Sequence, residues 1–239
     1  MDAELYKIVY QFRLANQERK VFSILLDPKT ISLIQHGVVS TPEWAKLEYH
    51  QCECCPLEKT AYPYCPIAVN INNIVIEFRG MVPTDNCQVI CITPERTYIK
   101  KTSIMEGLAS IYGVVMATSN CPVMDFFKPM ARFHLPFSTS EETAVRATSM
   151  FLLRRYFEYG SDTPHRFDFK QLEQTYANVI AVNKGLYTRI KSLETGTVEK
   201  IAVIILNSFS LSLSLGFKYS LESLAYLFTP QDKAKSTQT

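Results

Sequence analysis

Five side chains that bind soft metal ions gather within sixteen consecutive positions of this sequence. They are His50, Cys52, Cys54, Cys55 and Cys65. Cys52 and Cys55 form a C-x2-C pair, a spacing that lets two thiolates turn onto one ion. Because we expect the chain to stay in a reducing compartment, thiols at this density favour a metal site over a disulfide framework.

Proline follows three of the seven cysteines, namely Cys55, Cys65 and Cys121. Average proline usage of about 5% would place only about 0.35 such pairs in seven positions. Proline stiffens the backbone after a ligand, and a cysteine run that ends in Cys-Pro is typical of iron–sulfur proteins. We therefore predict one metal site, with His50 or Cys54 as a substitute for one ligand. The predicted ligands are Cys52, Cys55, Cys65 and Cys121.

Three interpretations of these cysteines stay open. Zn2+ accepts four thiolates, tolerates a histidine and is the first hypothesis. A [4Fe–4S] cluster accepts the same thiolates and fits the Cys-Pro bias. In the third interpretation no metal binds, since free cysteines are among the most buried residue types. We expect Cys87 and Cys91, which lie in an apolar run, to be core residues in every case.

The proline loop, residues 119–138, is the second segment with chemical potential. Its prolines are Pro122, Pro129 and Pro136. It carries Lys128, Arg132 and His134 shortly before the expected start of a helix, where free N–H groups and a positive dipole favour an anionic ligand. Histidine also suits acid–base chemistry near neutral pH. In the alternative, Arg132 and His134 only pair with carboxylates of the chain and so fix the position of the loop. The carboxylates available for that purpose are Asp125, Glu141 and Glu142.

Other catalytic classes find little support. The sequence has no G-x-S-x-G, G-x-G-x-x-G, Walker A or H-E-x-x-H motif, and its eight glycines offer no phosphate-binding loop. A cysteine nucleophile paired with His50 or His134 is not favoured, because nothing separates one cysteine from the others. An enzyme that acts on an anionic substrate through His134 and Arg132 stays a minor alternative.

The elements that must position these residues begin with two β-hairpins. Alternating apolar residues predict a strand over Tyr6–Leu14, and a second strand follows over 20–26. A short helix is expected over 30–36. Apolar spacings of three and four then predict a helix over 67–78, directly after Cys65. Strands over 87–93 and 96–101 form the second predicted hairpin.

Helices dominate the rest of the chain. Ser103 and Glu106 form a capping box for a helix to Thr118, and Ser138 and Glu141 form another for a helix to about Tyr159. Residues 160–164 are the expected linker, and everything beyond it to residue 228 has a helical pattern. Four polar side chains of the late helices are predicted to form a solvated or interfacial face. They are Tyr176, Asn183, Tyr187 and Arg189.

The sequence therefore predicts an α+β fold, with N-terminal β-hairpins and helices followed by a mostly helical C-terminal part. The expected divisions are an α+β domain over 1–160 with the metal site, a helical part over 165–228 packed on it, and a disordered tail over 229–239. At 239 residues, with 47% apolar and 20% charged residues, the chain is long and apolar enough for a sizeable core.

Charge and hydropathy limit the partners. A net charge of +2, with basic residues scattered, gives no basic stripe for nucleic acid. The first residues lack the basic and apolar regions of a secretory signal, so we expect a cytoplasmic protein. Residues 201–217 are uncharged but include Asn207 and four serines, so we favour a core helix or a homodimer interface over a membrane span.

Three sequence blocks resemble a family of uncharacterised bacterial proteins. They are YKIVYQFRL … KVFSILLDPKTISLI, HQCECCPL … CPIAVNI and SNCPVMDFFKPMARFHLPFSTSEETAVRATSMFLL. The resemblance covers about residues 5–157 and implies a bacterial cytoplasmic origin, with the Cys-Pro blocks and the Arg132–His134 segment as signatures. Cys54 departs from the H-x-C-x-x-C-P pattern of that family. The resemblance implies no activity or substrate.

We therefore expect a metal-binding module with a structural zinc, acting by binding or sensing rather than by catalysis. The site would join the loop at 50–66 to the loop at 119–122, as a disulfide would do in an oxidising compartment. A protein partner or a second copy of the chain would bind through the C-terminal helices. An iron–sulfur redox module is the first alternative, and the small enzyme described above is the second.

Overall fold

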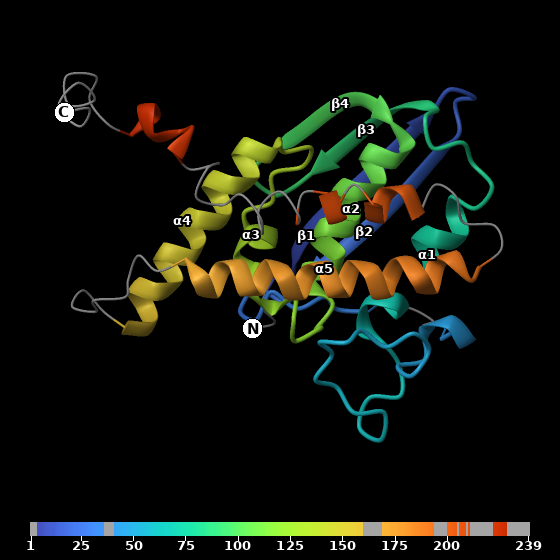
Figure 1. Ribbon diagram of the computed structural model, residues 1–239. Coiled ribbons are helices and arrows are strands. Elements are labelled where there is room, and N and C mark those ends of the chain that lie inside the picture. The colour runs from blue at the N-terminus through green and yellow to red at the C-terminus, as the bar shows by residue number, and fades with distance from the viewer. Residues whose placement is uncertain are drawn as a thin grey trace.

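Four strands form one antiparallel sheet in the computed structural model of the protein (Figure 1). The structure describes residues 4–35, 41–159, 169–193, 200–204, 206–208, 210 and 222–228. The strands are β1 (Tyr6–Leu14), β2 (Arg19–Leu26), β3 (Asn86–Ile92) and β4 (Thr97–Ser103). Their order is β2-β1-β3-β4, so β1 joins the two predicted hairpins into one sheet. The predicted α+β fold, with a mostly helical C-terminal part, is confirmed.

The alternation along β1 decides which face of the sheet is covered. Lys7 and Arg13 are exposed on one face. The opposite face is buried and consists of Tyr6, Ile8, Tyr10 and Phe12. Tyr10 lies opposite Phe22 of β2 and Cys91 of β3, so the same face continues across the neighbouring strands. One face of the sheet therefore forms the floor of the core.

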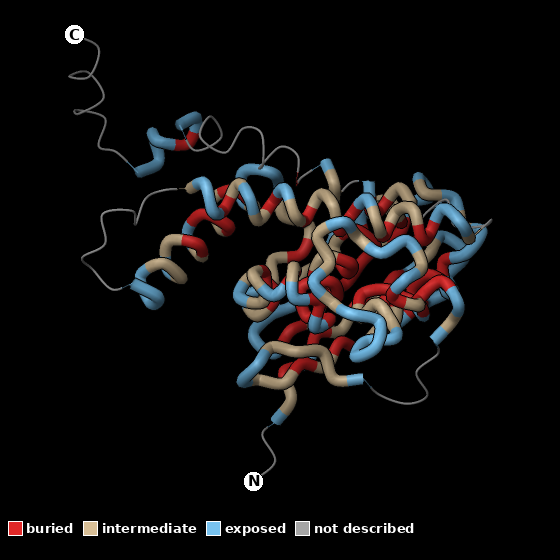
Figure 2. Tube along the Cα trace, turned by 60° about the horizontal axis from the view of Figure 1, so that its bottom comes forward, coloured by how far each residue is buried: buried red, intermediate tan, exposed pale blue. Residues whose placement is uncertain are grey.

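Two helices cover that face. They are α1 (Pro66–Glu77) and α2 (Ile104–Thr118), and eleven of the fifteen residues of α2 are buried. A Cβ added to Gly107 of α2 would lie 2.6 Å from Cε1 of Phe12 and 2.8 Å from Cγ2 of Val89. The glycine thus permits a closer approach of α2 to the sheet than any other residue would. Figure 2 shows the buried residues concentrated where sheet and helices meet.

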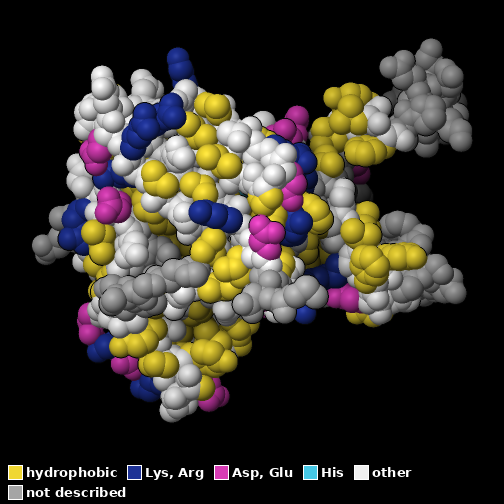
Figure 3. Space-filling model, turned by 180° about the vertical axis from the view of Figure 1, so that it is seen from behind, with side chains coloured by type: hydrophobic (Ala, Val, Ile, Leu, Met, Phe, Trp, Pro, Cys, Tyr) yellow, Lys and Arg dark blue, Asp and Glu magenta, His cyan; other side chains and the backbone are white. Residues whose placement is uncertain are grey.

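The later chain adds an outer helical part. It consists of η2 (Asp125–Phe127), α3 (Lys128–Arg132), α4 (Ser140–Tyr159), α5 (Lys170–Lys191), helical residues at 200–204 and 206–208, and η3 (Ala225–Leu227). The helix α5 runs along the molecule beside the loop of residues 41–65, while the end of α4 projects away (Figure 1). Apolar side chains lie exposed on that end of α4 and on η3 (Figure 3). They include Tyr156, Phe157, Tyr226 and Phe228.

Three local expectations are wrong. Residues 30–35 form a turn and an isolated bridge instead of a helix, because the Asp27 carboxylate accepts the N–H groups of Lys29 and Thr30; residue 36 lies outside the described residues. The segment 119–138 includes η2 and α3 and is not a simple loop. The capping box of α4 is Thr139 with Glu142, one residue later than predicted.

Among the described residues, no helix is both long enough and apolar enough to cross a bilayer. The expected linker at 160–164 and the tail at 229–239 lie outside the described residues.

Candidate functional site

The cysteine loop, residues 41–65, is closed at its base by backbone hydrogen bonds. Leu47 N donates to Pro63 O at 2.9 Å, and Cys65 N donates to Ala45 O at 2.7 Å. The four cysteines of this region are therefore presented by a loop whose two ends lie close together, beside α5 (Figure 1).

Arg189 of α5 fastens the cysteine loop to the helix. Its Nη1 donates to Trp44 O at 2.8 Å and to Lys46 O at 2.7 Å, and its Nη2 donates to Leu47 O at 2.8 Å. The side chain is only 1% exposed. Three buried hydrogen bonds from one guanidinium hold the start of the loop against α5.

This buried arginine lies away from the carboxylates of the described residues. Among the residues that the structure describes, no carboxylate oxygen lies within ion-pair distance of Arg189. A buried cation is costly unless a negative group lies nearby. The positive charge of Arg189 acts on the Cys52 thiol. It lowers the pKa of Cys52, although burial raises that pKa by more. Burial dominates, so the pKa of the Cys52 thiol is raised overall, and the charge of Arg189 offsets only part of that rise.

A glycine in the middle of α5 makes room for Cys52. A Cβ added to Gly185 would lie 2.6 Å from Sγ and 3.5 Å from Cα of Cys52. The neighbouring Cys54 also contacts α5, with its Sγ donating to Asn178 O at 3.4 Å. Glycine lowers helix stability by roughly 1 kcal/mol relative to alanine, and here it allows the loop backbone to approach the helix.

The four predicted ligands lie in one neighbourhood. Burial, with smaller contributions from negative charge on Cys65, Cys54 and Cys121, raises the pKa of Cys52 to about 12. Burial likewise raises the pKa of Cys121 to about 11, with smaller contributions from Cys65 and Cys55. Mutual effects of this kind fall off with distance. Thiols from the cysteine loop and from the proline loop therefore converge.

Two of these cysteines stand at the start of a helix or a turn. Cys65 is the N-cap of α1, followed by a proline at the first helical position, where the helix dipole favours a negative group. The backbone of Val123 and Met124 lowers the pKa of Cys121 against the larger effect of burial, and Met124 N donates to Cys121 O at 2.9 Å. Cys55 N donates to Cys52 O at 3.0 Å, so this pair lies on one turn.

The convergence stops short of a formed metal centre. Within the part of the chain that the structure describes, no three His, Cys, Asp or Glu side chains lie close enough together to hold a metal ion. The possible substitute His50 is exposed, has a positive φ of 50° and packs only its ring edge on Tyr49. The other possible substitute, Cys54, is half-buried against α5. Cys87 and Cys91 are buried in β3, as predicted.

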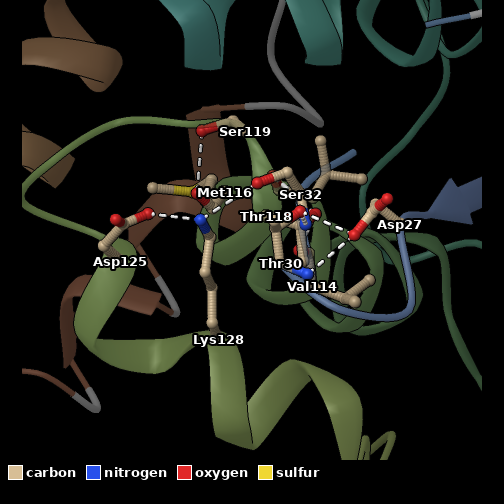
Figure 4. Close-up of polar contacts among 10 residues, drawn as sticks. Asp27, Thr30, Ser32, Val114, Met116, Thr118, Ser119, Asp125 and Lys128 are labelled. Carbon is tan, nitrogen blue, oxygen red and sulfur yellow. Dashed lines mark hydrogen bonds and ion pairs between the residues drawn. The ribbon is translucent and has the colours of Figure 1, made fainter. Parts of the chain in front are cut away.

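The ammonium group of Lys128 links the proline loop to the turn after β2 (Figure 4). It lies 2.8 Å from Oδ1 of Asp125 and donates to Oγ of Ser32 at 3.1 Å. Ser32 lies in the turn after β2, and Asp125 lies in η2. The lysine therefore holds the proline loop against the end of the first hairpin.

Arg132 and His134 also have partners within the chain. Arg132 forms an ion pair with Glu95 at 3.2 Å and stacks on the ring of Tyr6, with its Cζ 4.1 Å from the ring centroid. His134 Nε2 lies 2.5 Å from the hydroxyl of Tyr10. These partners differ from the expected Asp125, Glu141 and Glu142. Lys128, Arg132 and His134 thus point to three different places rather than to one ligand.

One cavity adjoins the proline loop. Its volume is about 470 Å³, and its walls come from α2, α3, α4, α5 and the residues that follow α3. Of the three predicted ligand-binding residues, only His134 lines it. Arg146 of α4 and Asn183 of α5, neither of which was predicted as a site residue, line it as well.

Sequence patterns could identify the cysteines but not the residues of α5 that contact the cysteine loop or line the cavity. Tyr176, Asn183 and Arg189 were expected on a solvated or interfacial face, yet within this chain all three are buried. An arginine that donates to backbone carbonyls has no sequence signature, because any residue supplies those acceptors. The one available signal was Gly185, an isolated glycine inside a helical pattern, which indicates a close approach.

The family of the chain can be stated at this point. Residues 8–229 match the family described as a domain of unknown function, DUF6901. The chain belongs to this family. The match spans the cysteine loop, the proline loop and α5, so both candidate regions are parts of the DUF6901 domain. Neither the curated proteins nor the solved structures give a significant match.

Proposed function

We propose that this DUF6901 domain is a metal-binding module with one structural zinc ion. The four ligands would be Cys52, Cys55, Cys65 and Cys121. The ion would join the cysteine loop to the proline loop, and both loops would be held against α5. A site with four protein ligands leaves no position open for substrate, so its task would be structural rather than catalytic.

The observation that carries the proposal is the buried, unbalanced charge of Arg189. One Zn2+ with four thiolates carries a net charge of −2, and a cation in the second shell would offset it. Arg189 is buried, has no carboxylate partner among the described residues and lowers the pKa of Cys52. Without a negative group nearby, the burial of this guanidinium would cost several kcal/mol.

Two further features support the same site. The backbone of Val123 and Met124 lowers the pKa of Cys121 and so offsets part of the effect of burial. Gly185 removes the side chain that would keep Cys52 from α5. The first feature makes a thiolate at Cys121 less costly, and the second allows close packing of the Cys52 sulfur. Inert core cysteines need neither.

Elemental analysis of the whole protein, purified without oxygen, tests the proposal. We expect about one zinc per chain and no colour. Cys52→Ser should lose the metal, whereas Cys87→Ser, at a buried position in β3 away from the site, should keep it. Protein that contains no metal and does not bind added Zn2+ would overturn the proposal.

The Cys-Pro bias favours a second candidate, a [4Fe–4S] redox module. Three of the seven cysteines precede proline, as is typical of such proteins. In that case the same preparation would be brown, would contain iron and sulfide, and would lose its colour in Cys52→Ser. Colour therefore separates the two candidates in a single preparation.

A further inference from the structure

The cavity of about 470 Å³ is lined mainly by apolar side chains. Its walls include the flexible side chains of Met105, Met116, Met124 and Met130. Ligand pockets typically measure about 300–1,000 Å³, and methionines adapt to ligands of irregular shape. At roughly 30 Å³ for a water-sized group, the space takes on the order of fifteen such groups.

A half-buried cation lies in this apolar wall. Arg146 of α4 donates through Nη2 to Met130 O at 3.1 Å and to Phe133 O at 2.7 Å. Its other guanidinium nitrogens have no acceptor among the residues that the structure describes, and no carboxylate there lies within ion-pair distance. The nearest negative side chain, Glu142, instead accepts the N–H of Thr139 at 2.8 Å.

A second polar group of the cavity wall lacks a partner. Asn183 of α5 is 1% exposed, and its amide nitrogen donates to Ser210 Oγ at 3.3 Å. Its Oδ1 is buried and accepts no hydrogen bond from the described residues. A buried acceptor without a donor is destabilising, so the missing donor is expected inside the cavity.

The other polar groups of the wall leave Arg146 as the dominant charge. Burial, and next the charge of Arg146, lower the pKa of His134 to about 3, so this ring is neutral. The hydroxyl of Tyr10 bonds to both His134 and Ser110. Lys100 and Glu106 also line the cavity and carry one charge of each sign. Burial raises the pKa of Tyr176, which also lines the cavity, well above its usual value, so this side chain is neutral.

We propose that this cavity binds a small monocarboxylate with an extended apolar body, such as a medium-chain fatty acid. The carboxylate would accept the free N–H groups of Arg146, and the apolar body would pack among the methionines. A water molecule or hydroxyl brought in with the ligand would donate to Asn183 Oδ1. The cavity walls include none of the four cysteines, so this proposal does not depend on the metal site.

Isothermal titration with decanoate and with decanol tests whether binding requires the negative charge of the carboxylate. We expect saturable 1:1 binding of decanoate, at least tenfold tighter than decanol, since a charge-assisted hydrogen bond contributes about 1.5–3 kcal/mol. Arg146→Gln should weaken decanoate about tenfold or more and change decanol less than about twofold. Arg154→Gln, on the same helix but outside the cavity wall, is the matched control and should change neither.

A substitution on α2 tests the location. A Cβ added to Gly113 would meet no atom closer than Leu206 Cδ2 at 3.9 Å, so the position opens into the cavity. Gly113→Leu should fill the space and abolish decanoate binding, whereas Gly113→Ala should keep it. No saturable binding of decanoate, equal binding of decanoate and decanol, or unchanged binding by Gly113→Leu would each overturn the proposal. If Arg146→Gln fails to fold, the comparison of decanoate with decanol on the native protein still tests the proposal.

Discussion

The cysteine loop and the proline loop are held in place by opposite kinds of electrostatics. In the proline loop, Lys128 and Arg132 each lie beside a carboxylate, and both ion pairs are partly exposed. In the cysteine loop, Arg189 is buried and donates only to backbone carbonyls. Charge is balanced in the first region and unbalanced in the second. Sequence patterns marked both regions as candidate sites, and this difference separates them.

The difference shows which polar residues are available for function. A charged side chain that has found its complement within the chain stabilises the fold and offers little to a ligand. A cation or acceptor without a complement requires one from elsewhere, because burying it alone is costly. By this criterion Arg189, Arg146 and Asn183 are of more interest than Lys128 and Arg132.

The largest effect is expected from Arg189→Met. The change removes the Arg189 donor from the buried carbonyl oxygens of Trp44 and Leu47, while Lys46 O keeps a hydrogen bond from Tyr49 N, so it should lower the free energy of unfolding by about 3 kcal/mol. Urea denaturation measures it. Lys191→Met, at an exposed position of the same helix, should change stability by less than about 0.5 kcal/mol. A loss below about 1 kcal/mol in Arg189→Met would mean that the cysteine loop is not held by this side chain.

The next effect concerns pH and the proline loop. Burial lowers the pKa of His134 to about 3, whereas the unfolded chain has a pKa near about 6.5. The unfolded state therefore takes up a proton as pH falls below about 6.5, while the folded state does not. Stability from this group is complete above that pH and falls by about 1.4 kcal/mol per pH unit below it, down to about pH 3.

Unfolding free energies of the native protein and of His134→Gln, measured between pH 7 and pH 5, check this prediction. The native protein should lose about 2 kcal/mol more than the variant over that range. Taking the difference removes the contribution of carboxylates common to both proteins. Parallel curves would show that His134 titrates in the folded state as it does in the unfolded chain.

A smaller effect is expected from Gly185→Ala on the α5 side of the cysteine loop. The new methyl group would overlap Cys52 Sγ, so stability should fall by about 1 kcal/mol or more, despite the higher helix propensity of alanine. Gly113→Ala is the matched control, since its methyl group has space and should raise stability by up to about 1 kcal/mol. Thermal unfolding measures both, and equal stabilisation would contradict the close approach of Cys52.

The smallest effects belong to the ion pairs of the proline loop. Lys128→Met should cost about 1 kcal/mol, because the ammonium group is partly buried and also bonds Ser32. Arg132→Gln should cost less than about 1 kcal/mol, since its ion pair with Glu95 is more exposed. Thermal unfolding at low and high salt measures them. If either change lowered the free energy of unfolding by about 3 kcal/mol, the ion pairs of the proline loop would matter as much as Arg189, which contradicts the comparison.

Periodicity predicted most of the elements but not how they assemble. The alternation of β1 and the three- and four-residue spacings of α1 gave strand and helix to within one or two residues. The pairing of β1 with β3 was not predicted, because a hairpin pattern says nothing of its neighbours. The capping box of α4 was placed one residue early, since Ser138 with Glu141 and Thr139 with Glu142 have the same spacing.

The candidate site was predictable only as far as its side chains have characteristic chemistry. The spacing of the cysteines singled out the cysteine loop, and the Cys-Pro pairs linked it to Cys121, whose thiol the structure brings near. The contacts of Arg189 with three carbonyls depend on how α5 packs, as does the burial of Asn183. Neither property is local, so no short pattern could reveal it.

The central position of β1 affects the protein while it is being made. This strand is synthesised first, yet one of its edges pairs with β3, whose last residue is Ile92. A nascent chain shorter than that has an unpaired edge on an apolar strand, and such edges recruit strands of other molecules. Conditions that slow elongation before Ile92, or that crowd nascent chains together, should therefore favour aggregation, and slowing elongation after that residue should matter far less.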